Sequence, residues 1–400
     1  MSGVFFIFVS MRCIDKFEEV YRRTPDGLSF CPYRVCPLGA HVDHQYGKVT
    51  GFALDKGINI AFSRKMNGVV ELASLQFEKR AQWHVRSVPE TKQGDWADYL
   101  RGATLKLGQR FPLVCGMSAV IEGSMPIGGL SSSAAVIIAF LKALCTVNDI
   151  HLSRKEILDV ALDAEFNYVG VSVGKLDQSC ELYSKKEHLL FLDTLDDSYE
   201  LIPVPSDVKP WKVAVFFSGV ERTLAGSKFN MRVDEVKSAA YALKAFSGME
   251  YAKFDQTYLR DVPREVYDQY KDRLPDNWRK RAEHFYSEQD RVVRGSVAWR
   301  RGDIVSFGKL ITESGSSSIN NWETGSPELK TLYETIIRQD GVYGGRFSGA
   351  GFKGCCMALI DPSYADSIAE AVERDYLSAF PLLKGKYKFY CCETSDGVEL

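Results

Sequence analysis

The spacing of apolar and polar positions along the chain predicts a mixture of strands and helices. Short apolar or alternating runs, which are typical of strands, occupy residues 57–62, 68–73, 188–192, 212–217, 355–360 and 386–391. Apolar residues recur at helical spacing over residues 96–108, 132–147, 154–168, 228–246, 281–300 and 327–338. The two kinds of segment do not alternate as in a doubly wound sheet, so the pattern favours an α+β fold.

A length of 400 residues is typical of two domains. Two prolines interrupt the periodicity at residues 202–206, so we place the boundary there, with one domain over 1–205 and a second over 206–400. The apolar run 4–9 is too short for a membrane span, and no basic residue precedes it. We therefore expect an edge strand or an irregular start of the chain there, with a targeting segment as the less favoured alternative.

Composition narrows the class of function. Lys and Arg total 50 and Asp and Glu total 52, a formal net charge of -2, which argues against a general nucleic-acid binder. The 10 cysteines include two adjacent pairs but no Cys-x-x-Cys pair, and the 6 histidines show no zinc-site spacing. We therefore expect reduced thiols in a cytoplasmic protein, with no nucleic-acid, membrane or obligate protein partner.

The segment 125–135, Met-Pro-Ile-Gly-Gly-Leu-Ser-Ser-Ser-Ala-Ala, joins an apolar strand to the helix predicted over 132–147. Its proline and glycines permit a tight turn, and its serines stand where the first N–H groups of the helix lack partners. Such a helix start can bind phosphate, and hydroxyls beside it can bind the Mg²⁺ that a nucleotide carries. An ordinary serine N-cap is the alternative.

Two carboxylates stand out downstream. Glu165 follows Ala161 by four residues on the apolar face of the helix predicted over 154–168, where it needs a partner such as Mg²⁺. Alternatively, the helix end turns Glu165 to solvent or onto an arginine. Asp177 lies in a predicted loop of small residues, 170–179, where it could accept a proton from a substrate hydroxyl or serve as a turn residue.

Taken in order, these segments resemble the motifs of the GHMP family of small-molecule kinases, in its galactokinase-like branch. Residues 34–44, Arg-Val-Cys-Pro-Leu-Gly-Ala-His-Val-Asp-His, resemble the sugar-kinase signature Arg-x-Asn-x-x-Gly-Glu-His-x-Asp-Tyr. Residues 126–134 match the phosphate motif, and the glycine-rich segment 344–354 resembles the third motif, with Ala350 in place of a family glycine. The segments around Glu165 and Asp177 match those of the Mg²⁺ glutamate and the catalytic aspartate.

The resemblance implies a ribosomal S5 domain 2-like N-terminal half and a ferredoxin-like C-terminal half, with the active site in the cleft between them. It implies phosphoryl transfer from ATP, with Asp177 as general base and Arg34 beside it to keep it ionised and stabilise charge. It implies that Ser133 and Glu165 hold Mg²⁺, although which serine does so is left open. The residues implied to surround the ATP phosphates are Gly128, Gly129, Leu130, Ser131, Ser132 and Ser133.

The departures from the family pattern concern the sugar. Galactokinases have glutamate where this chain has Ala40, and a family Ser-Glu-Tyr-Asn is Ser-Lys-Phe-Asn at residues 227–230. Losing one acid and gaining a cation at Lys228 both favour an anionic sugar. The signature resembles the form found in galacturonokinases, which convert ATP and D-galacturonate to ADP and the 1-phosphate, a product that feeds sugar-nucleotide salvage. The residues expected at the sugar are Ala40, His41, Asp43, His44, Lys228 and Phe229.

Two other functions are compatible with the sequence. Neutral drift at Ala40 would leave a galactokinase or another aldose 1-kinase. A catalytically silent sensor that binds sugar and ATP is a different class, although intact Arg34, Asp177 and Glu165 argue against it. Lys228, His44, Arg222 and backbone amides are all candidates for binding the sugar carboxylate.

Overall fold

The structure is a computed structural model that describes residues 11–220 and 226–400, with side chains from residue 229 onward in the second range. The helices are α1 (Met11–Tyr21), α2 (Asp98–Gly108), α3 (Ser132–Val147), α4 (Arg154–Asp163), α5 (Leu176–Tyr183), α6 (Gly226–Ser247), α7 (Arg264–Tyr270), α8 (Asp276–Arg300), α9 (Ile304–Asn320), α10 (Pro327–Ile336) and α11 (Ala365–Ala379). The strands are β1 (Gly27–Val35), β2 (Lys48–Lys65), β3 (Val69–Ser74), β4 (Ala81–His84), β5 (Gly116–Gly123), β6 (His188–Asp193), β7 (Tyr199–Pro203), β8 (Lys212–Phe217), β9 (Val342–Phe347), β10 (Cys355–Ile360), β11 (Lys388–Cys392) and β12 (Thr394–Ser395).

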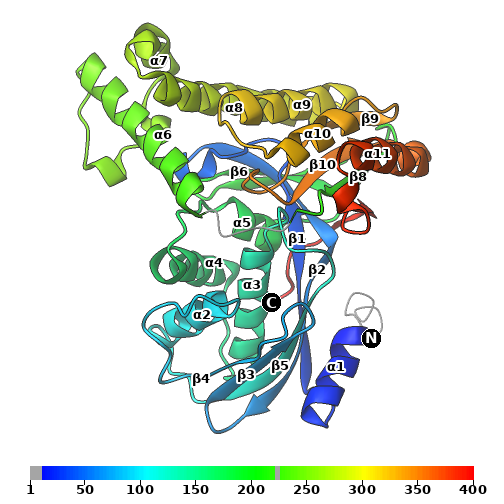
Figure 1. Ribbon diagram of the computed structural model, residues 1–400. Helices are drawn as coiled ribbons and strands as arrows, with labels where there is room; N and C mark the ends of the chain where they lie inside the picture. The colour runs from blue at the N-terminus through cyan, green and yellow to red at the C-terminus, as the bar shows by residue number, and fades with distance from the viewer. Residues whose placement is uncertain (1–10, 221–225) are drawn as a thin grey trace.

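The first sheet is organised around the long strand β2. The strand order is β4-β3-β5-β2-β6-β7, and β1 and β12 also pair with β2. Helices α2, α3 and α4 lie on one side of this sheet and α1 lies on the other (Figure 1). Cys13 and Phe17 of α1 pack against Ala61, Ala73 and Val120, which closes the second face.

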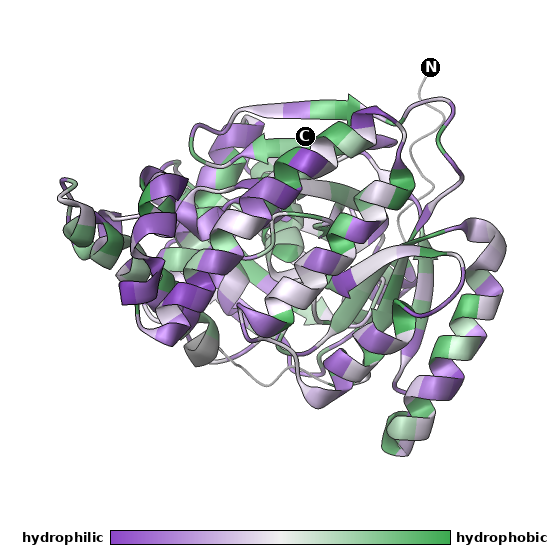
Figure 2. Ribbon diagram, turned by 90° about the horizontal axis from the view of Figure 1, so that it is seen from above, coloured by the Kyte–Doolittle hydropathy of each residue, from purple (hydrophilic) through white to green (hydrophobic). Residues whose placement is uncertain are grey.

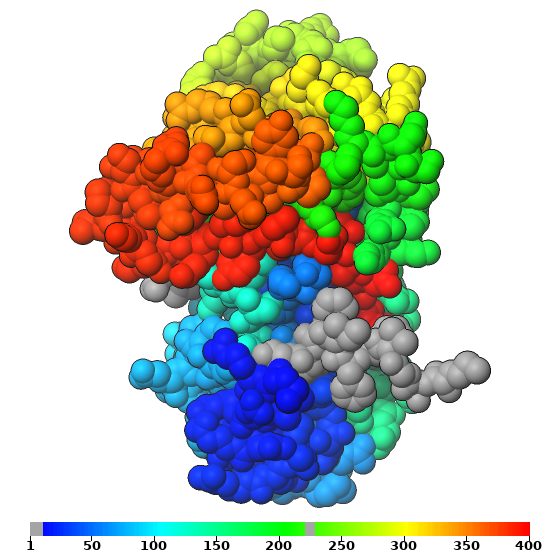
Figure 3. Space-filling view, turned by 90° about the vertical axis from the view of Figure 1, so that its right-hand side faces the viewer, coloured from blue at the N-terminus to red at the C-terminus, as the bar shows by residue number. Residues whose placement is uncertain are grey.

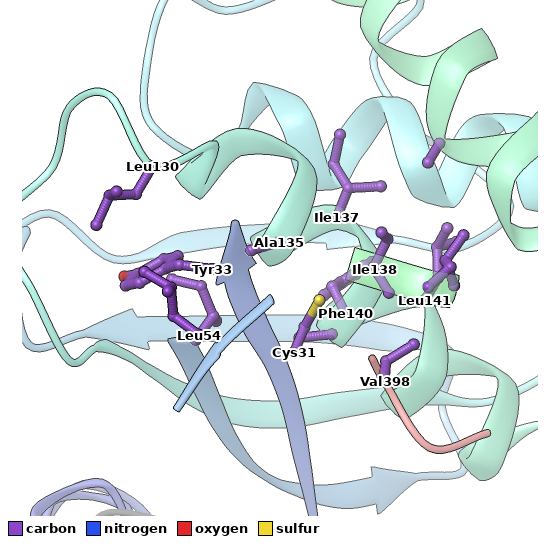
Figure 4. Packing of buried hydrophobic residues seen from close by; sticks show 14 of the residues in the cluster. Cys31, Tyr33, Leu54, Leu130, Ala135, Ile137, Ile138, Phe140, Leu141 and Val398 are labelled. Carbon is purple, nitrogen blue, oxygen red and sulfur yellow. The ribbon is translucent and has the colours of Figure 1, made fainter. Parts of the chain in front are cut away.

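Helix α3 is apolar around most of its circumference because it is enclosed on all sides. Ile137, Ile138, Phe140 and Leu141 are fully buried in the main core. Figure 4 shows these side chains beside residues of β1 and β2 and beside Val398 from the C-terminal tail. This packing fixes the N-terminal end of α3, which the glycine-serine turn precedes, relative to the end of β1.

The second sheet has the order β11-β8-β10-β9, and all of its pairings are antiparallel. Alternate residues of β8 face opposite ways, as expected for a sheet covered on both faces. Ala214 and Phe216 pack with helices α10 and α11, whereas Val213, Val215 and Phe217 join the main core. Figure 2 shows the resulting pattern, with green apolar strands beneath helices whose outward positions are largely purple or pale.

The second sheet begins after residue 206, but the tail of the chain returns to the first sheet. Thr394 pairs with Leu54 of β2, and Val398 lies in the first core. In the space-filling view the early residues in blue and cyan form one lobe, and the late residues in yellow to red form the other (Figure 3). The division of the chain at residue 205 stays a prediction.

The α+β class is confirmed, and the strands at 212–217 and 355–360 and the helix at 132–147 have their predicted bounds. The helix predicted over 154–168 ends at Asp163 and continues as a π-helical segment, Ala164–Val169. The loop predicted at 170–179 is wrong in its second half, because α5 begins at Leu176.

The remaining predictions concern the cysteines and the membrane. The 10 cysteines all fall within the described residues, and all are free. In residues 11–220 and 226–400 no helix combines the length and the apolar character needed to cross a bilayer. The run 4–9, Arg222 and the Lys228 side chain lie outside the described part of the chain.

Candidate active site

Arg34 and Asp177 form a buried ion pair, although 143 residues separate them in the chain. Arg34 is near the end of β1 with a side chain 4% exposed, and Asp177 is in the first turn of α5 with a side chain 26% exposed. Arg34 Nε and Nη2 both lie 2.7 Å from Asp177 Oδ1. Arg34 Nη1 also donates to Gly129 O at 3.2 Å. One arginine therefore joins the segment around Asp177 to the glycine-serine turn.

The turn before α3 depends on left-handed backbone at three residues. The φ angles of Gly128, Gly129 and Ser131 are 133°, 90° and 60°. Ser131 occupies the N-cap position, yet its hydroxyl does not cap the helix and instead donates to Asp177 Oδ2. The ordinary N-cap interpretation is thus wrong for this serine. Because Ser131 does not cap them, the first N–H groups of α3 can bind an anionic ligand.

The two glycine-rich segments pack backbone against backbone. A Cβ added to Gly129 would lie 2.6 Å from Cys355 Sγ, and one added to Gly354 would lie 2.9 Å from the carbonyl carbon of Gly128. Ser348 Oγ donates to Gly129 O at 2.6 Å, which fixes the contact. The segment 344–354 therefore supports the glycine-serine turn directly. Ala350 does not have a positive φ, so its methyl group causes no backbone strain.

Glu165 lies on the π-helical segment, where the residue is 2% exposed. Its carboxylate accepts a hydrogen bond from Nε2 of Gln178, the neighbour of Asp177. Ser133 is in the first turn of α3. Carboxylate and hydroxyl oxygens suit Mg²⁺, which is usually bound through one or two carboxylates plus substrate phosphates.

The loop that contains Ala40 is buried, and the Ala40 residue is only 4% exposed. Glu288 of α8 accepts hydrogen bonds at Oε1 from the N–H groups of Gly39 and Ala40, at 2.7 and 3.2 Å. His284 Nε2 lies 2.9 Å from Ala40 O. Both backbone groups of Ala40 are therefore held by the second half of the chain.

Glu288 is fully buried but carries a negative charge. Burial alone would raise the pKa of its carboxyl, but Arg291, His284 and Arg346 outweigh burial and lower the pKa to about 2. Ser314 Oγ donates to Glu288 Oε1 at 2.7 Å. Ala40 therefore lies next to an anionic carboxylate that the protein itself supplies.

Asp43 lies close to the start of α5, which contains Asp177. Its Oδ2 accepts a hydrogen bond from Leu176 N at 3.3 Å, and burial together with the carboxylate of Asp177 raises the pKa of Asp43 to about 6. His41 and His44 flank Asp43 and contact Phe229 of α6 at ring-centroid distances of 6.4 and 6.2 Å. Of the residues expected at the sugar, all those with described side chains thus lie in one region.

Two residues of this region, Glu288 and Trp322, are not among those predicted from the sequence. Glu288 lies on the buried face of α8 between Phe285 and Val292, so the spacing rule that singled out Glu165 would also have found it. Trp322 stacks on His41 with ring centroids 5.1 Å apart. It follows α9 in an irregular segment, where no periodic pattern exists to indicate its orientation.

Comparisons with known proteins agree with this arrangement. Residues 98–185 match the GHMP kinases N terminal domain, residues 297–378 match the GHMP kinases C terminal domain, and residues 15–64 match the galactokinase galactose-binding signature. The chain is 37% identical over 393 residues to the galacturonokinase of Arabidopsis thaliana, covering 92% of each protein. It is 32% identical to the galactokinase of Pyrococcus furiosus, covering 92% of this chain and 97% of that protein.

Solved structures give the same result. The crystal structure of Lactococcus lactis galactokinase complexed with galactose matches with a TM-score of 0.86 and 26% identity, covering 96% of this chain and 98% of that one. The mevalonate kinase of Methanococcus jannaschii, 14% identical with a TM-score of 0.64, shares the fold. The chain therefore belongs to the GHMP kinase family, and it is an ATP-dependent sugar kinase.

Proposed function

We propose that this protein is a galacturonokinase, which transfers the γ-phosphoryl group of ATP to the C1 hydroxyl of D-galacturonate. The observation that carries the proposal is Ala40, which replaces the acid of the galactokinase signature in a chain 37% identical to a named galacturonokinase. A carboxylate in the side chain at position 40 would repel an anionic sugar. Alanine removes that repulsion.

The contacts of Asp177 support its role as general base. One of its oxygens is paired with Arg34, and the other accepts from Ser131, so its orientation is fixed. Asp177 would take the proton of the C1 hydroxyl while that oxygen bonds to the γ-phosphorus and the bond from phosphorus to the ADP oxygen breaks. Arg34 would stabilise the charge that develops near the reacting oxygen.

The start of α3 supports a role in holding ATP. Gly128 and Gly129 allow the backbone to approach the phosphates closely, and uncapped N–H groups would bind them. Ser133 and Glu165 would hold Mg²⁺, which supplies charge neutralisation at the β- and γ-phosphates. We further propose that the enzyme acts in the cytoplasm and needs only the sugar and ATP as partners.

A galactokinase is the second candidate, favoured by the TM-score of 0.86 with a galactokinase structure. An ADP-release assay with galacturonate, galactose and glucuronate separates the candidates. We expect kcat/KM to be highest with galacturonate. Turnover of galactose but not of galacturonate would replace the proposal with galactokinase activity. Nucleotide binding without turnover of any sugar would favour a silent sensor.

A further inference from the structure

A cluster of aromatic rings lies beside the Ala40 loop, and we name it the ring cluster. Trp322 is at its centre, with ring-centroid distances of 5.1 Å to His41, 5.6 Å to His44 and 5.5 Å to His284. Phe229 approaches His44 edge-on at 6.2 Å. Trp322 is fully buried, so the polar atoms of this cluster have little access to water.

Three ring nitrogens of the cluster have no hydrogen-bond partner among the described residues. They are His41 Nε2, His44 Nε2 and Trp322 Nε1. His284 differs, because its Nδ1 lies 2.9 Å from Ser317 Oγ and its Nε2 lies 2.9 Å from Ala40 O. A buried polar group without a partner destabilises a protein, so three in one cluster require an explanation.

The protonation of His44 follows from its neighbour Gln45. Gln45 Oε1 accepts a hydrogen bond from Leu259 N at 3.0 Å, so the Nε2 amide group of Gln45 is the one that faces His44 Nδ1 at 3.4 Å. An amide N–H can only donate, so this contact favours His44 Nδ1 as the acceptor and the proton of the neutral ring on Nε2. Burial and the charge of Lys237 lower the pKa of His44 to about 3, so the ring is neutral at physiological pH.

His44 Nε2 and Trp322 Nε1 are therefore assigned as two N–H donors in neighbouring rings, and neither has an acceptor in residues 11–220 or 226–400. The nearest ring of α6, Phe229, carries no oxygen that could accept from His44. Two donors without acceptors suit a ligand group that has two oxygens and no proton to give, which is the chemistry of a carboxylate.

The position of the cluster matches one end of a sugar. His44 is adjacent to Asp43, whose side chain contacts the residue before Asp177. A hexose whose C1 hydroxyl lies at Asp177 would extend from there along Asp43 toward the rings. We propose that His44 Nε2–H and Trp322 Nε1–H bind the carboxylate of the sugar acid. This inference rests on the proposed function and specifies its carboxylate site.

The test uses the full chain and two conservative variants. Trp322→Phe keeps the stacked ring and removes the N–H, and His44→Asn keeps an acceptor toward Gln45 but loses the distal N–H. We expect each variant to lower kcat/KM for galacturonate at least about tenfold, the effect of losing a hydrogen bond to a charged group. Activity with galactose should change less than about threefold, because galactose has a hydroxyl in place of the carboxylate.

The matched control is Trp96→Phe. Trp96 also stacks on an aromatic ring, that of Phe77, and its N–H donates to Lys79 O at 2.8 Å, away from the site. This variant should leave the ratio of galacturonate to galactose activity unchanged. Equal losses with both sugars in Trp322→Phe and His44→Asn, or no loss, would overturn the inference.

Calorimetric binding of galacturonate without ATP separates this inference from the proposed function. If the wild type bound galacturonate but did not phosphorylate it, the proposed galacturonokinase activity would be rejected. The affinities of Trp322→Phe and His44→Asn for galacturonate would still show whether these residues bind its carboxylate. Turnover of galacturonate by the wild type with unchanged affinity in both variants would reject the carboxylate site alone. Absence of both binding and turnover in the wild type would reject both.

Discussion

The hydroxyl of Ser131 donates a hydrogen bond to Oδ2 of Asp177, which links the turn before α3 to the first turn of α5. Arg34 occupies the other oxygen of the same carboxylate and also contacts Gly129 in that turn. The candidate base and the candidate phosphate loop are therefore parts of one hydrogen-bonded unit.

Asp177→Ala should abolish phosphoryl transfer. Loss of a general base costs about 10²–10⁴-fold in rate. Removing the carboxylate also leaves the buried Arg34 guanidinium unpaired, so the melting temperature should fall. Asp177→Asn is the matched variant, because its oxygen can still accept from Arg34 although it cannot take a proton. Equilibrium binding of ATP should persist in both, and kcat near the wild-type value would show that the base lies elsewhere.

Ser131 combines a functional hydroxyl with a left-handed backbone, and two variants separate these features. Ser131→Ala and Ser131→Gly both lose the hydrogen bond to Asp177, so both should lower kcat, by about three- to tenfold. Glycine adopts a φ of 60° without strain. The free energy of unfolding of the glycine variant should therefore exceed that of the alanine variant by about 1 kcal/mol, and its melting temperature should be higher. Equal kcat values in the wild type and both variants would mean that Ser131 does not orient the base.

Ala40→Glu should shift the substrate preference from galacturonate toward galactose. The new carboxylate would lie near ionised Glu288, and it would repel the carboxylate of the sugar acid. Ala40→Gln has nearly the same volume without the charge and is the matched control. The ratio of kcat/KM for galacturonate to kcat/KM for galactose should fall further in the glutamate variant than in the glutamine variant. Equal ratios in the two variants would attribute any effect to size alone.

Much of this site could be predicted from the sequence, because its residues lie in local motifs. The glycine-serine turn can be recognised because an apolar helix follows it directly. Glu165 can be recognised because its helical spacing places a carboxylate on an apolar face. The pairing of Arg34 with Asp177 could be expected only from the family resemblance, since no local pattern connects residues so distant in the chain. Trp322 could not be predicted, because its orientation depends on the packing of α6, α8 and the Ala40 loop around it.

Glu181 lies one helical turn after Asp177, fully buried, and neither carboxyl oxygen has a partner among the described residues. Burial, with a smaller effect from Asp177, raises its pKa well above the ordinary value of 4.5. Between 4.5 and this raised pKa the native protein keeps a proton that the unfolded chain releases, so stability falls as pH rises.

Glu181→Gln should remove this pH dependence. The difference in unfolding free energy between variant and wild type should grow in favour of the variant from pH 5 to pH 8, by at most about 1.4 kcal/mol per pH unit. Urea titrations at each pH provide the measurement. Glu78→Gln changes an exposed carboxylate and should show no such trend. A constant difference between Glu181→Gln and wild type across this range would contradict a protonated Glu181.

Gly129 supports the turn through both its conformation and its lack of a side chain. Its φ is 90°, and an added Cβ would approach Cys355 Sγ to 2.6 Å and Ser348 O to 3.0 Å. Gly129→Ala should therefore push the two glycine-rich segments apart. We expect a loss of stability above about 2 kcal/mol and a several-fold rise in KM for ATP, because the phosphate turn would move.

Gly385→Ala isolates the conformational part of that effect. Gly385 has a similar φ of 82°, but an added Cβ would meet nothing within 4 Å. This variant should lose only about 1 kcal/mol, the cost of left-handed backbone in a residue with a side chain, and its KM for ATP should equal that of the wild type. If the two variants lost the same stability and bound ATP equally well, the contact between the glycine-rich segments would have no part in shaping the phosphate turn.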